Sequence, residues 1–388
     1  MPKIDPEVEA FARIKVIGLG GSGKNAVNHM IESKVKGVEF IVMNTDAQDL
    51  HNSLAKKKIH IGKNLTRGLG TGMNPEMGKK AAEETKEDIQ NVIKGSDMVF
   101  IACGMGGGTG TGSSATIARI AREEGVLTVA VVTKPFFFEG KHRMKIAEQG
   151  IAELKKEVDA LIIIPNDKLM GIVEKETTFE DAFSLCDEVL RQAVEGISDL
   201  ITTPGIINVD FADIRAVMSN AGSALMGIGF ATGEKRAVEA AHAAINSPLL
   251  DISITGAHGV LFAIAGGDDL TMHEIQDAAK VITESVDSEA RVIFGAIKDT
   301  KLKKDEVKVT VIASGFPEDG MRELTDLSEK EEIETKKETA TKEQKKDKKE
   351  IHNTIDRGTE INIKKNVESI DDDDDWNAIP AFLRRSKK

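Results

Sequence analysis

Two glycine-rich segments of this 388-residue chain have the composition of loops that hold phosphate groups. The more informative one, Gly104–Gly112, contains six glycines in nine residues together with two threonines. Glycine this dense costs conformational entropy at every position, and a simple turn needs only one or two. A flexible surface loop is the alternative, but the segment follows a buried strand, at the end where α/β sheets bind ligands. We therefore predict a nest of backbone N–H groups around anionic oxygens.

The second segment, Gly18–Gly23, comes after the first predicted strand and before a helix. It matches the dinucleotide fingerprint G-x-G-x-x-G and nearly matches the P-loop, whose Ser or Thr is replaced here by Asn25. In both motifs, glycines admit phosphate oxygens to the backbone, and a helix N-terminus supplies free N–H groups. A tight turn without a ligand is the alternative interpretation. A third segment, Thr66–Pro75, could close over a terminal phosphate or could be a surface linker.

The segments around these loops alternate between strand and helix patterns. Short runs of Val and Ile, hardly interrupted by polar residues, are typical of strands buried on both faces of a parallel sheet. Helical patterns between them predict an α/β sheet with helices on both faces. The predicted strands are Ile14–Leu19, Val38–Met43, Met98–Ala102, Val126–Thr133 and Ala160–Ile164, and the predicted helices are Pro75–Ile93, Ser113–Glu124 and Arg143–Val158.

A second region begins with one long predicted helix. From Thr178 to Ile201, apolar residues recur with the 3.6-residue period of a helix buried along one side. Strands and helices then alternate again, which predicts a smaller α/β domain joined to the first by the long helix. Its predicted strands are Leu225–Phe230, Val260–Ala265, Arg291–Ile297 and Val307–Ile312, and its predicted helices are Glu234–Ala244 and Thr271–Ser285.

The overall composition excludes several classes of protein. The formal net charge of −12 leaves no surplus of basic residues for general binding of nucleic acid. The two cysteines, Cys103 and Cys186, stand in apolar segments without metal-binding spacing, as expected in a reducing cytosol. The first residues lack a signal-peptide pattern, and no apolar run approaches the roughly 20 residues that span a bilayer. We therefore expect a soluble, cytoplasmic protein without a membrane span.

The composition changes after about Pro317. Residues 329–350 are almost wholly Glu, Lys and Thr, which cannot bury enough surface to offset the entropy of ordering. We predict a disordered linker, although Glu–Lys pairs could instead support an isolated charged helix. Beyond Asp371–Asp375, a cluster of large apolar residues indicates a docking peptide for partner proteins. The cluster consists of Trp376, Ile379, Pro380, Phe382 and Leu383.

Together, these motifs resemble the FtsZ family of tubulin-like GTPases of bacterial cell division. Gly106–Gly112 resembles the signature shared with tubulin, and Asn44–Gln48, Phe136–Arg143 and Asn208–Asp213 are similar to further family motifs. The resemblance implies a tubulin-like α/β fold. Its parts would be a Rossmann-like GTP-binding domain (11–177), a central helix (178–203), a C-terminal α/β domain (204–316), a disordered linker (317–370) and a partner-binding tail peptide (371–388).

The resemblance also implies one site for GTP or GDP, with Mg²⁺ held through the nucleotide. Glu139 and Arg143 would contact the ribose and phosphates. Asn166, Phe183 and Asp187 would form the base pocket, where a carboxylate can accept from the N1–H and N2 amine of guanine. The pattern alone would place Phe183 in the core. The phosphate-binding residues would be Gly21, Ser22, Gly23, Lys24, Asn25, Gly72, Gly106, Gly107, Gly108, Thr109 and Gly110.

Catalysis would use Asn208, Asp210 and Asp213, which resemble the loop that completes the active site of the neighbouring subunit in the family. Two carboxylates three residues apart share one face at a helix start and could orient a water for attack on the γ-phosphate. The sequence alone favours an N-cap and a first-turn acid there. A site shared between neighbours implies head-to-tail contacts, which generate open filaments.

The implied biology is polymerisation into a cytokinetic ring beneath the membrane at midcell, with membrane-tethering and regulatory proteins bound by the tail. The chain departs from the family pattern at Ser22, Lys24, Thr71 and Phe137, and Thr71 stands where Ala is common. These changes could alter nucleotide affinity or turnover.

Two other functions compete with this one. An NAD-type oxidoreductase built on the Gly18–Gly23 fingerprint would not explain Gly104–Gly112, and it would need an acid closing the second strand, where Asp46 lies past the end. A scaffold that binds nucleotide without hydrolysing it would not explain Asp210 and Asp213.

Overall fold

The computed structural model describes residues 12–171, 177–203, 205–250, 254, 256–299 and 302–316. The predicted linker and tail, including Trp376, Ile379, Pro380, Phe382 and Leu383, lie outside these residues. Within the described part, no helix is long and apolar enough to cross a membrane.

A single ten-stranded sheet runs through the described part, in the order β3-β2-β1-β4-β5-β6-β7-β10-β8-β9. The strands are β1 (Ile14–Leu19), β2 (Val38–Asn44), β3 (Lys57–His60), β4 (Met98–Gly104), β5 (Leu127–Lys134), β6 (Ala160–Pro165), β7 (Gly222–Thr232), β8 (Gly259–Gly266), β9 (Arg291–Lys298) and β10 (Glu306–Ser314). Neighbours from β3 to β7 pair in parallel, as predicted for the first region. Strand β10 is antiparallel to both of its neighbours, β7 and β8, so the second half of the sheet is mixed.

Helices cover the sheet on both faces. They are α1 (Gly20–Glu32), α2 (Ala47–His51), α3 (Lys63–Thr66), α4 (Pro75–Glu84), α5 (Lys86–Ile93), α6 (Thr109–Glu123), α7 (Lys141–Leu154), α8 (Asn166–Leu169), α9 (Phe179–Thr202), α10 (Phe211–Met218), α11 (Arg236–Ile245) and α12 (Met272–Glu284), with a 3₁₀ turn at Phe137–Glu139. Alternate residues of each central strand point to opposite faces, so Val16 packs in the core under α1 and α9, and Ile17 in the core under α4 to α7.

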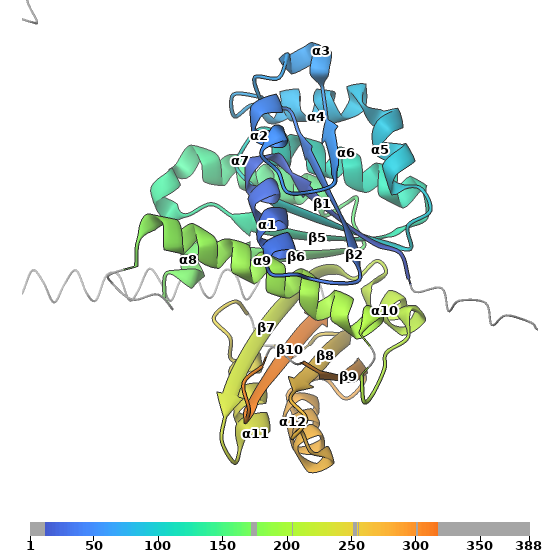
Figure 1. Cartoon of the computed structure of the whole chain (residues 1–388), viewed down its shortest axis with the longest axis vertical. Coiled ribbons are helices and arrows are strands. Elements are labelled where there is room, and N and C mark those ends of the chain that lie inside the picture. Colours follow the sequence, from blue (N-terminus) through green and yellow to red (C-terminus); the bar gives the residue numbers. More distant parts are fainter. Residues whose placement is uncertain are drawn as a thin grey trace, which may run out of the picture. The chain divides into compact units, whose positions relative to one another are not determined.

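The long predicted helix is α9, which Figure 1 shows between the strands near α1 and the strands β7–β10. It starts at a capping box in which Thr178 accepts from the backbone N–H of Asp181 and the Asp181 carboxylate accepts from Thr178. Its apolar stripe is buried along most of its length, at Ala182, Cys186, Val189, Leu190, Ala193, Val194, Ile197 and Leu200. The helix therefore packs against the core that contains α1 and the central strands β1, β4, β5 and β6.

The predicted helix Pro75–Ile93 is wrong as one element, because it is divided at Thr85 into α4 and α5. The Thr85 hydroxyl donates to the carbonyl of Ala81 and accepts from the backbone N–H of Gly62. Thr85 thus closes the turn after β3 and interrupts the helix, a local use of a side chain that helical periodicity does not reveal.

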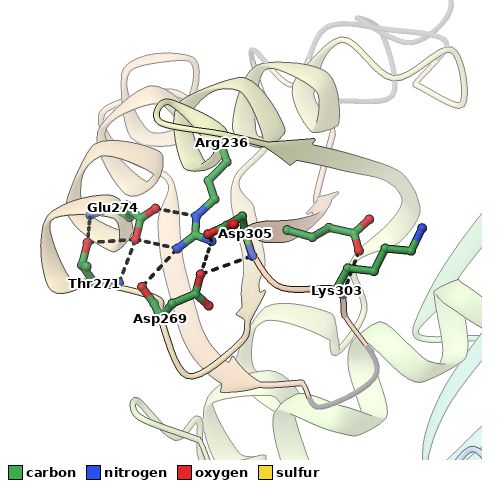
Figure 2. A network of polar contacts seen from close by, with 7 residues as sticks. Arg236, Asp269, Thr271, Glu274, Lys303 and Asp305 are labelled. Carbon is green, nitrogen blue, oxygen red and sulfur yellow. Dashed lines mark hydrogen bonds and ion pairs between the residues drawn. The ribbon is translucent and has the colours of Figure 1, made fainter.

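A buried arginine holds together the end of the structure that lies around α11 and α12 (Figure 2). Only 6% of the Arg236 side chain is exposed, and its guanidinium lies 2.6 Å from carboxylate oxygens of both Asp269 and Glu274. Asp305 approaches the same guanidinium at 3.9 Å. One side chain therefore connects α11 to the loop before α12 and to the turn before β10.

We expect Arg236→Met to lower the free energy of unfolding by about 3 kcal/mol, because it leaves two carboxylates without their partner in a partly buried site. Urea denaturation measures the change. Arg119→Met is the matched control, since Arg119 is exposed on α6, and it should shift stability by no more than about 0.5 kcal/mol. Equal stability of the two variants would contradict this role of Arg236.

Candidate functional site

The first glycine segment is shorter as a loop than predicted, because α1 already begins at Gly20, whose φ is +67°. Gly20, Gly21 and Ser22 form the first turn of the helix, and all three line a cavity. Gly23 serves packing instead, because a Cβ there would collide with the carbonyl oxygen of Ala102 on β4. The segment therefore provides an exposed helix N-terminus that can bind an anion. Its Gly23 also allows α1 to pack closely against β4.

Lys24 and Asn25 stand further along α1 and do not line the cavity. The Lys24 ammonium lies 2.6 Å from the carboxylate of Asp49 on α2, and only 13% of the Lys24 side chain is exposed. The other Asp49 oxygen accepts from the side-chain amide of Asn44 at 2.7 Å. Lys24 therefore ties α1 to the end of β2, and Asn25 is exposed.

The second glycine segment also divides into parts with different tasks. Gly107, Gly108, Thr109 and Gly110 line the cavity, and a Cβ on Gly107 would meet no atom within 4 Å. The N–H of Gly106 is already used by the Thr111 hydroxyl at 2.9 Å. Open N–H groups are therefore concentrated at Gly107 to Gly110, where α6 begins.

Part of the glycine density has a cause other than ligand binding. A Cβ on Gly112 would collide with the carbonyl oxygen of Pro75, and α6 could then not pack against α4. All six glycines were predicted to belong to a phosphate nest, and for Gly112 the structure shows helix packing instead. Glycine serves both purposes because each needs the absence of a side chain.

The third segment contributes through Thr71, which lines the cavity. Its hydroxyl lies 3.3 Å from the hydroxyl of Thr109 and against Gly108. Gly72 is exposed, has a φ of +57° and does not line the cavity. Thr71 appeared in the sequence only as a departure from the family, so the structure gives it a place that the pattern did not.

These three segments surround one cavity of about 290 Å³. The remaining lining residues come from the ends of β1, β4 and β5, from the 3₁₀ turn, and from α7, α8 and α9. They are Leu19, Gly104, Met105, Thr133, Pro135, Glu139, Arg143, Asn166, Phe183, Cys186 and Asp187. The cavity lies at the carboxyl ends of parallel strands, which is where open α/β sheets bind their ligands.

The α8–α9 end of the cavity presents groups suited to a planar polar ligand. The Oδ1 of Asn166 is buried and has no hydrogen-bond partner among the described residues. Burial raises the pKa of Asp187 to about 6, although the nearby charges of His29 and Lys24 act in the opposite direction. The ring of Phe183 packs edge-on against Phe136, with centroids 5.2 Å apart. An acceptor, a carboxyl and an aromatic ring thus converge, as expected for a guanine pocket.

Glu139 and Arg143 lie between the base end and the phosphate loops. The Glu139 carboxylate lies 2.6 Å from the Arg143 guanidinium and also accepts from the N–H of Phe136. The Nε of Arg143 is buried without a partner among the described residues. Two unsatisfied buried atoms, one acceptor and one donor, therefore border the same cavity, which fits a bound polar ligand.

Asn208, Asp210 and Asp213 lie away from this cavity and are exposed. The Asp210 side chain caps α10 by accepting from the N–H of Ala212, and Asp213 stands in the first turn. Asn208 accepts from the N–H of Gly205 at 2.6 Å. Within a single chain, Asp210 and Asp213 therefore have the capping arrangement that the sequence alone favoured.

The edge of the sheet fixes the loop that carries these residues. Ile206 donates from its N–H to the carbonyl of Ala296 on β9, and Ala296 donates back to Ile207. A Cβ on Gly205 would collide with the same carbonyl. Edge strand β9 thus holds the acidic loop at the surface, where it can meet another molecule.

Sequence reasoning missed two parts of the site. Cys186 lines the cavity, although its position on the apolar stripe of α9 is typical of a core residue. Burial raises the pKa of its thiol to about 12. Thr45, whose hydroxyl contacts Thr109, had only the match of Asn44–Gln48 to a family motif as a signal, and Asp49, which contacts Lys24 and Asn44, lies one residue beyond that motif. Among the described residues, no group of three or more His, Cys, Asp or Glu could hold a metal ion.

Comparisons with known proteins show the family to which the chain belongs. The model of the Tubulin/FtsZ family GTPase domain matches residues 13–174, and that of the FtsZ family C-terminal domain matches residues 222–317. The chain is similar to FtsZ from M. jannaschii, solved as an empty dimer, with 48% identity and a TM-score of 0.76 over 79% of this chain and 89% of that one.

Two more distant structures share the fold. CetZ1 from Haloferax volcanii, solved as a GDP-bound monomer, is 20% identical with a TM-score of 0.69 over 82% of this chain and 99% of that one. CetZ2 from the same organism, solved as a GTPγS-bound protofilament, is 19% identical with a TM-score of 0.67 over the same shares. The two matched family domains, the FtsZ relative and the cavity between the glycine loops and α9 establish that this chain belongs to the Tubulin/FtsZ family of GTPases.

Proposed function

We propose that this chain polymerises head to tail and hydrolyses GTP at sites that each need two subunits. This proposal rests on the carboxylates that line the cavity. Among the described lining residues, these are only Glu139, which is paired with Arg143, and Asp187, which lies at the base end. Neither is placed to orient a water at the terminal phosphate, whereas Asp210 and Asp213 are exposed on another surface. A neighbouring subunit can supply them.

The solved relatives support this assembly. The FtsZ of M. jannaschii was solved as a dimer, and the CetZ2 of Haloferax volcanii as a protofilament. In the proposed filament, the loop Gly205–Asp213 of one subunit covers the nucleotide cavity of the next. Asn208 would help position the water, and the two aspartates would polarise it.

Within one subunit, different cavity residues would bind different parts of the nucleotide. Backbone N–H groups of Gly20–Ser22 and Gly107–Gly110 would bind the phosphates, which also carry the Mg²⁺ ion. Asn166, Phe183 and Asp187 would read guanine, and Arg143 would reach the ribose and phosphates. Gly23, Lys24, Asn25, Gly72 and Gly106 would support these contacts by positioning the loops, since none lines the cavity.

A light-scattering assay with GTP, GDP and ATP, combined with phosphate release, tests this function. We expect assembly with GTP alone, and a rate of hydrolysis per subunit that rises with protein concentration, because each site needs a neighbour. A rate per subunit that stays constant across the assembly range would rule out the shared site.

The GTP affinity is expected to fall as the pH decreases below about 6. Burial raises the pKa of Asp187 to about 6, so the free protein protonates this carboxyl below that pH. Guanine needs the ionised form as an acceptor, and affinity should therefore drop about tenfold per pH unit below the pKa. Calorimetric titration with GTP from pH 5 to 8 measures it. Asp187→Asn is the control, because any slope that comes from the nucleotide persists in the variant.

We further propose that the filaments form a ring at the division site, with regulatory and membrane-tethering proteins bound by residues 371–388 through Trp376, Ile379, Pro380, Phe382 and Leu383. The linker (317–370) would connect this peptide to the folded domains (11–177 and 204–316) on either side of the central helix (178–203). The apolar cluster after an acidic run supports this role, since exposed apolar clusters usually mark interaction sites.

Deleting residues 376–388 should leave GTP hydrolysis within about twofold of the full chain, because the cavity residues found in the described part of the chain all lie between Leu19 and Asp187. The same deletion should abolish the recruitment of filaments to the division site in cells. Loss of hydrolysis with the deletion would show that the peptide belongs to the catalytic unit.

A further inference from the structure

Three threonine hydroxyl groups form a row where the phosphate loops meet. Thr45 Oγ1 lies 2.6 Å from Thr109 Oγ1, and Thr71 Oγ1 lies 3.3 Å from Thr109 Oγ1. The three residues come from separate segments: Thr45 follows β2, Thr109 begins α6, and Thr71 lies between α3 and α4. Thr109 and Thr71 line the cavity, and Thr45 is fully buried.

The number of hydroxyl protons gives this row a direction. Each hydroxyl carries one proton, so two contacts among three groups use two of the three. A proton left on Thr45 would have no acceptor, because the described residues offer its Oγ1 only Thr109. A buried donor without an acceptor is costly. Thr45 therefore donates to Thr109, and the unused proton lies on Thr109 or Thr71, where a ligand in the cavity can accept it.

The row lies at the phosphate end of the cavity. Asn166 and Asp187 belong to α8 and α9, whereas Thr71 lies in the connection between α3 and α4. With its base at Asp187 and its phosphates at the N–H groups of Gly21 and Gly108, as proposed above, a nucleotide would bring its outermost phosphate to the Thr71 hydroxyl, which lies against Gly108.

We propose that Thr71 is a specificity-determining residue that donates to the terminal phosphate of GTP, and that Thr45 is a positioning residue acting through Thr109. This rests on the proposed binding of GTP in the cavity. The order of donation is Thr45 to Thr109, Thr109 to Thr71, and Thr71 to a γ-phosphate oxygen. GDP lacks that oxygen, so the row favours the triphosphate.

The same residues connect the terminal phosphate to the loop that carries Thr71. The carbonyl of Thr45 accepts from the Thr66 hydroxyl at 3.2 Å and from the N–H of Gly70 at 3.4 Å. Thr45 thus holds the Thr66–Pro75 segment through its backbone and orients Thr71 through its side chain. In the proposed complex, the segment would contact the terminal phosphate through Thr71 and the end of β2 through Thr66 and Gly70.

The test compares affinities for a non-hydrolysable GTP analogue and for GDP across four variants of the full chain. Thr71→Ala should weaken binding of the analogue about tenfold or more while leaving GDP within about twofold, because a donor to a charged oxygen is lost. Thr71→Ser keeps the hydroxyl and should retain the wild-type ratio. Thr45→Val removes the buried donor that orders the row, so the Thr71–Thr109 bond can run in either direction, and the analogue should bind about threefold more weakly.

Thr45→Ser is the control for packing at that buried position and should behave like the wild type. Equal loss of the analogue and of GDP in Thr71→Ala, or no loss of either, would overturn the role of Thr71. Unchanged analogue binding in Thr45→Val would overturn the positioning role. If the wild-type chain itself failed to bind GTP in preference to ATP, the proposed function would fail instead, and the two failures are thereby distinguished.

Discussion

Asparagine in place of Asp187 is expected to change the preferred nucleotide from GTP to xanthosine triphosphate. In the proposed pose, the Asp187 carboxylate accepts from the N1–H and the N2 amine of guanine. Xanthine has an oxygen where guanine has that amine, so an asparagine can accept from N1–H and donate to the oxygen. With GTP, asparagine can still accept from N1–H but without a charge, and its amide group then faces the N2 amine donor to donor. A hydrogen bond to a charged group contributes about 1.5–3 kcal/mol, so weakening one contact and losing the other should reduce GTP affinity about 10²-fold or more.

Calorimetric titrations of both proteins with GTP, xanthosine triphosphate and ATP measure this change. Glu180→Gln, an exposed acid on the same helix, is the matched control and should leave GTP affinity unchanged. The phosphate contacts are the same for every ligand, so the expected result is an exchange of preference rather than a general loss. Equal weakening for all three nucleotides would mean that Asp187 supports the pocket without reading the base.

The predicted strands agree closely with the structure because buried parallel strands have a local signal. Ile14–Leu19 was predicted with its observed bounds, since four of its six residues are large and apolar and only Lys15 is charged. The antiparallel insertion of β10 between β7 and β8 depends on pairing between residues far apart in sequence, and no local pattern encodes it. Strand β3 was not predicted, because it has only four residues and two of them are exposed lysines, so it lacks the apolar pattern of the other strands.

The site was harder to predict because one residue type serves several tasks. Gly107 leaves the backbone open to a ligand, whereas Gly112 allows α6 to pack in contact with α4. The sequence shows glycine at both positions and does not distinguish these two roles. Phe183 fits the apolar stripe of α9 equally well as a core residue or as a cavity residue. Only the packing of α9 against the sheet decides which of its side chains reach the cavity.

Asp213→Asn is expected to bind GTP like the wild type and to lose about 10²- to 10⁴-fold in hydrolysis, the usual effect of removing a general base. Asp213 is exposed and far from the cavity lining, so nucleotide affinity should not change. Loss of a first-turn acid costs α10 about 0.3–1 kcal/mol, which is too little to unfold it. Glu239→Gln, which removes a first-turn acid from α11, is the control and should keep full activity.

Mixing Asp213→Asn with Asp187→Asn subunits separates a shared site from one contained in a single chain. With GTP and xanthosine triphosphate both present, each variant can load a nucleotide and enter filaments, yet neither alone should hydrolyse GTP. The first variant binds GTP but lacks the acid, and the second supplies the acid but loads the other nucleotide. In a head-to-tail filament, an Asp187→Asn subunit presents its intact loop to the GTP of its Asp213→Asn neighbour, so GTP hydrolysis should appear only in the mixture. If each chain instead used its own acids, every GTP-loaded subunit would remain inactive, and the mixture would release phosphate only from xanthosine triphosphate.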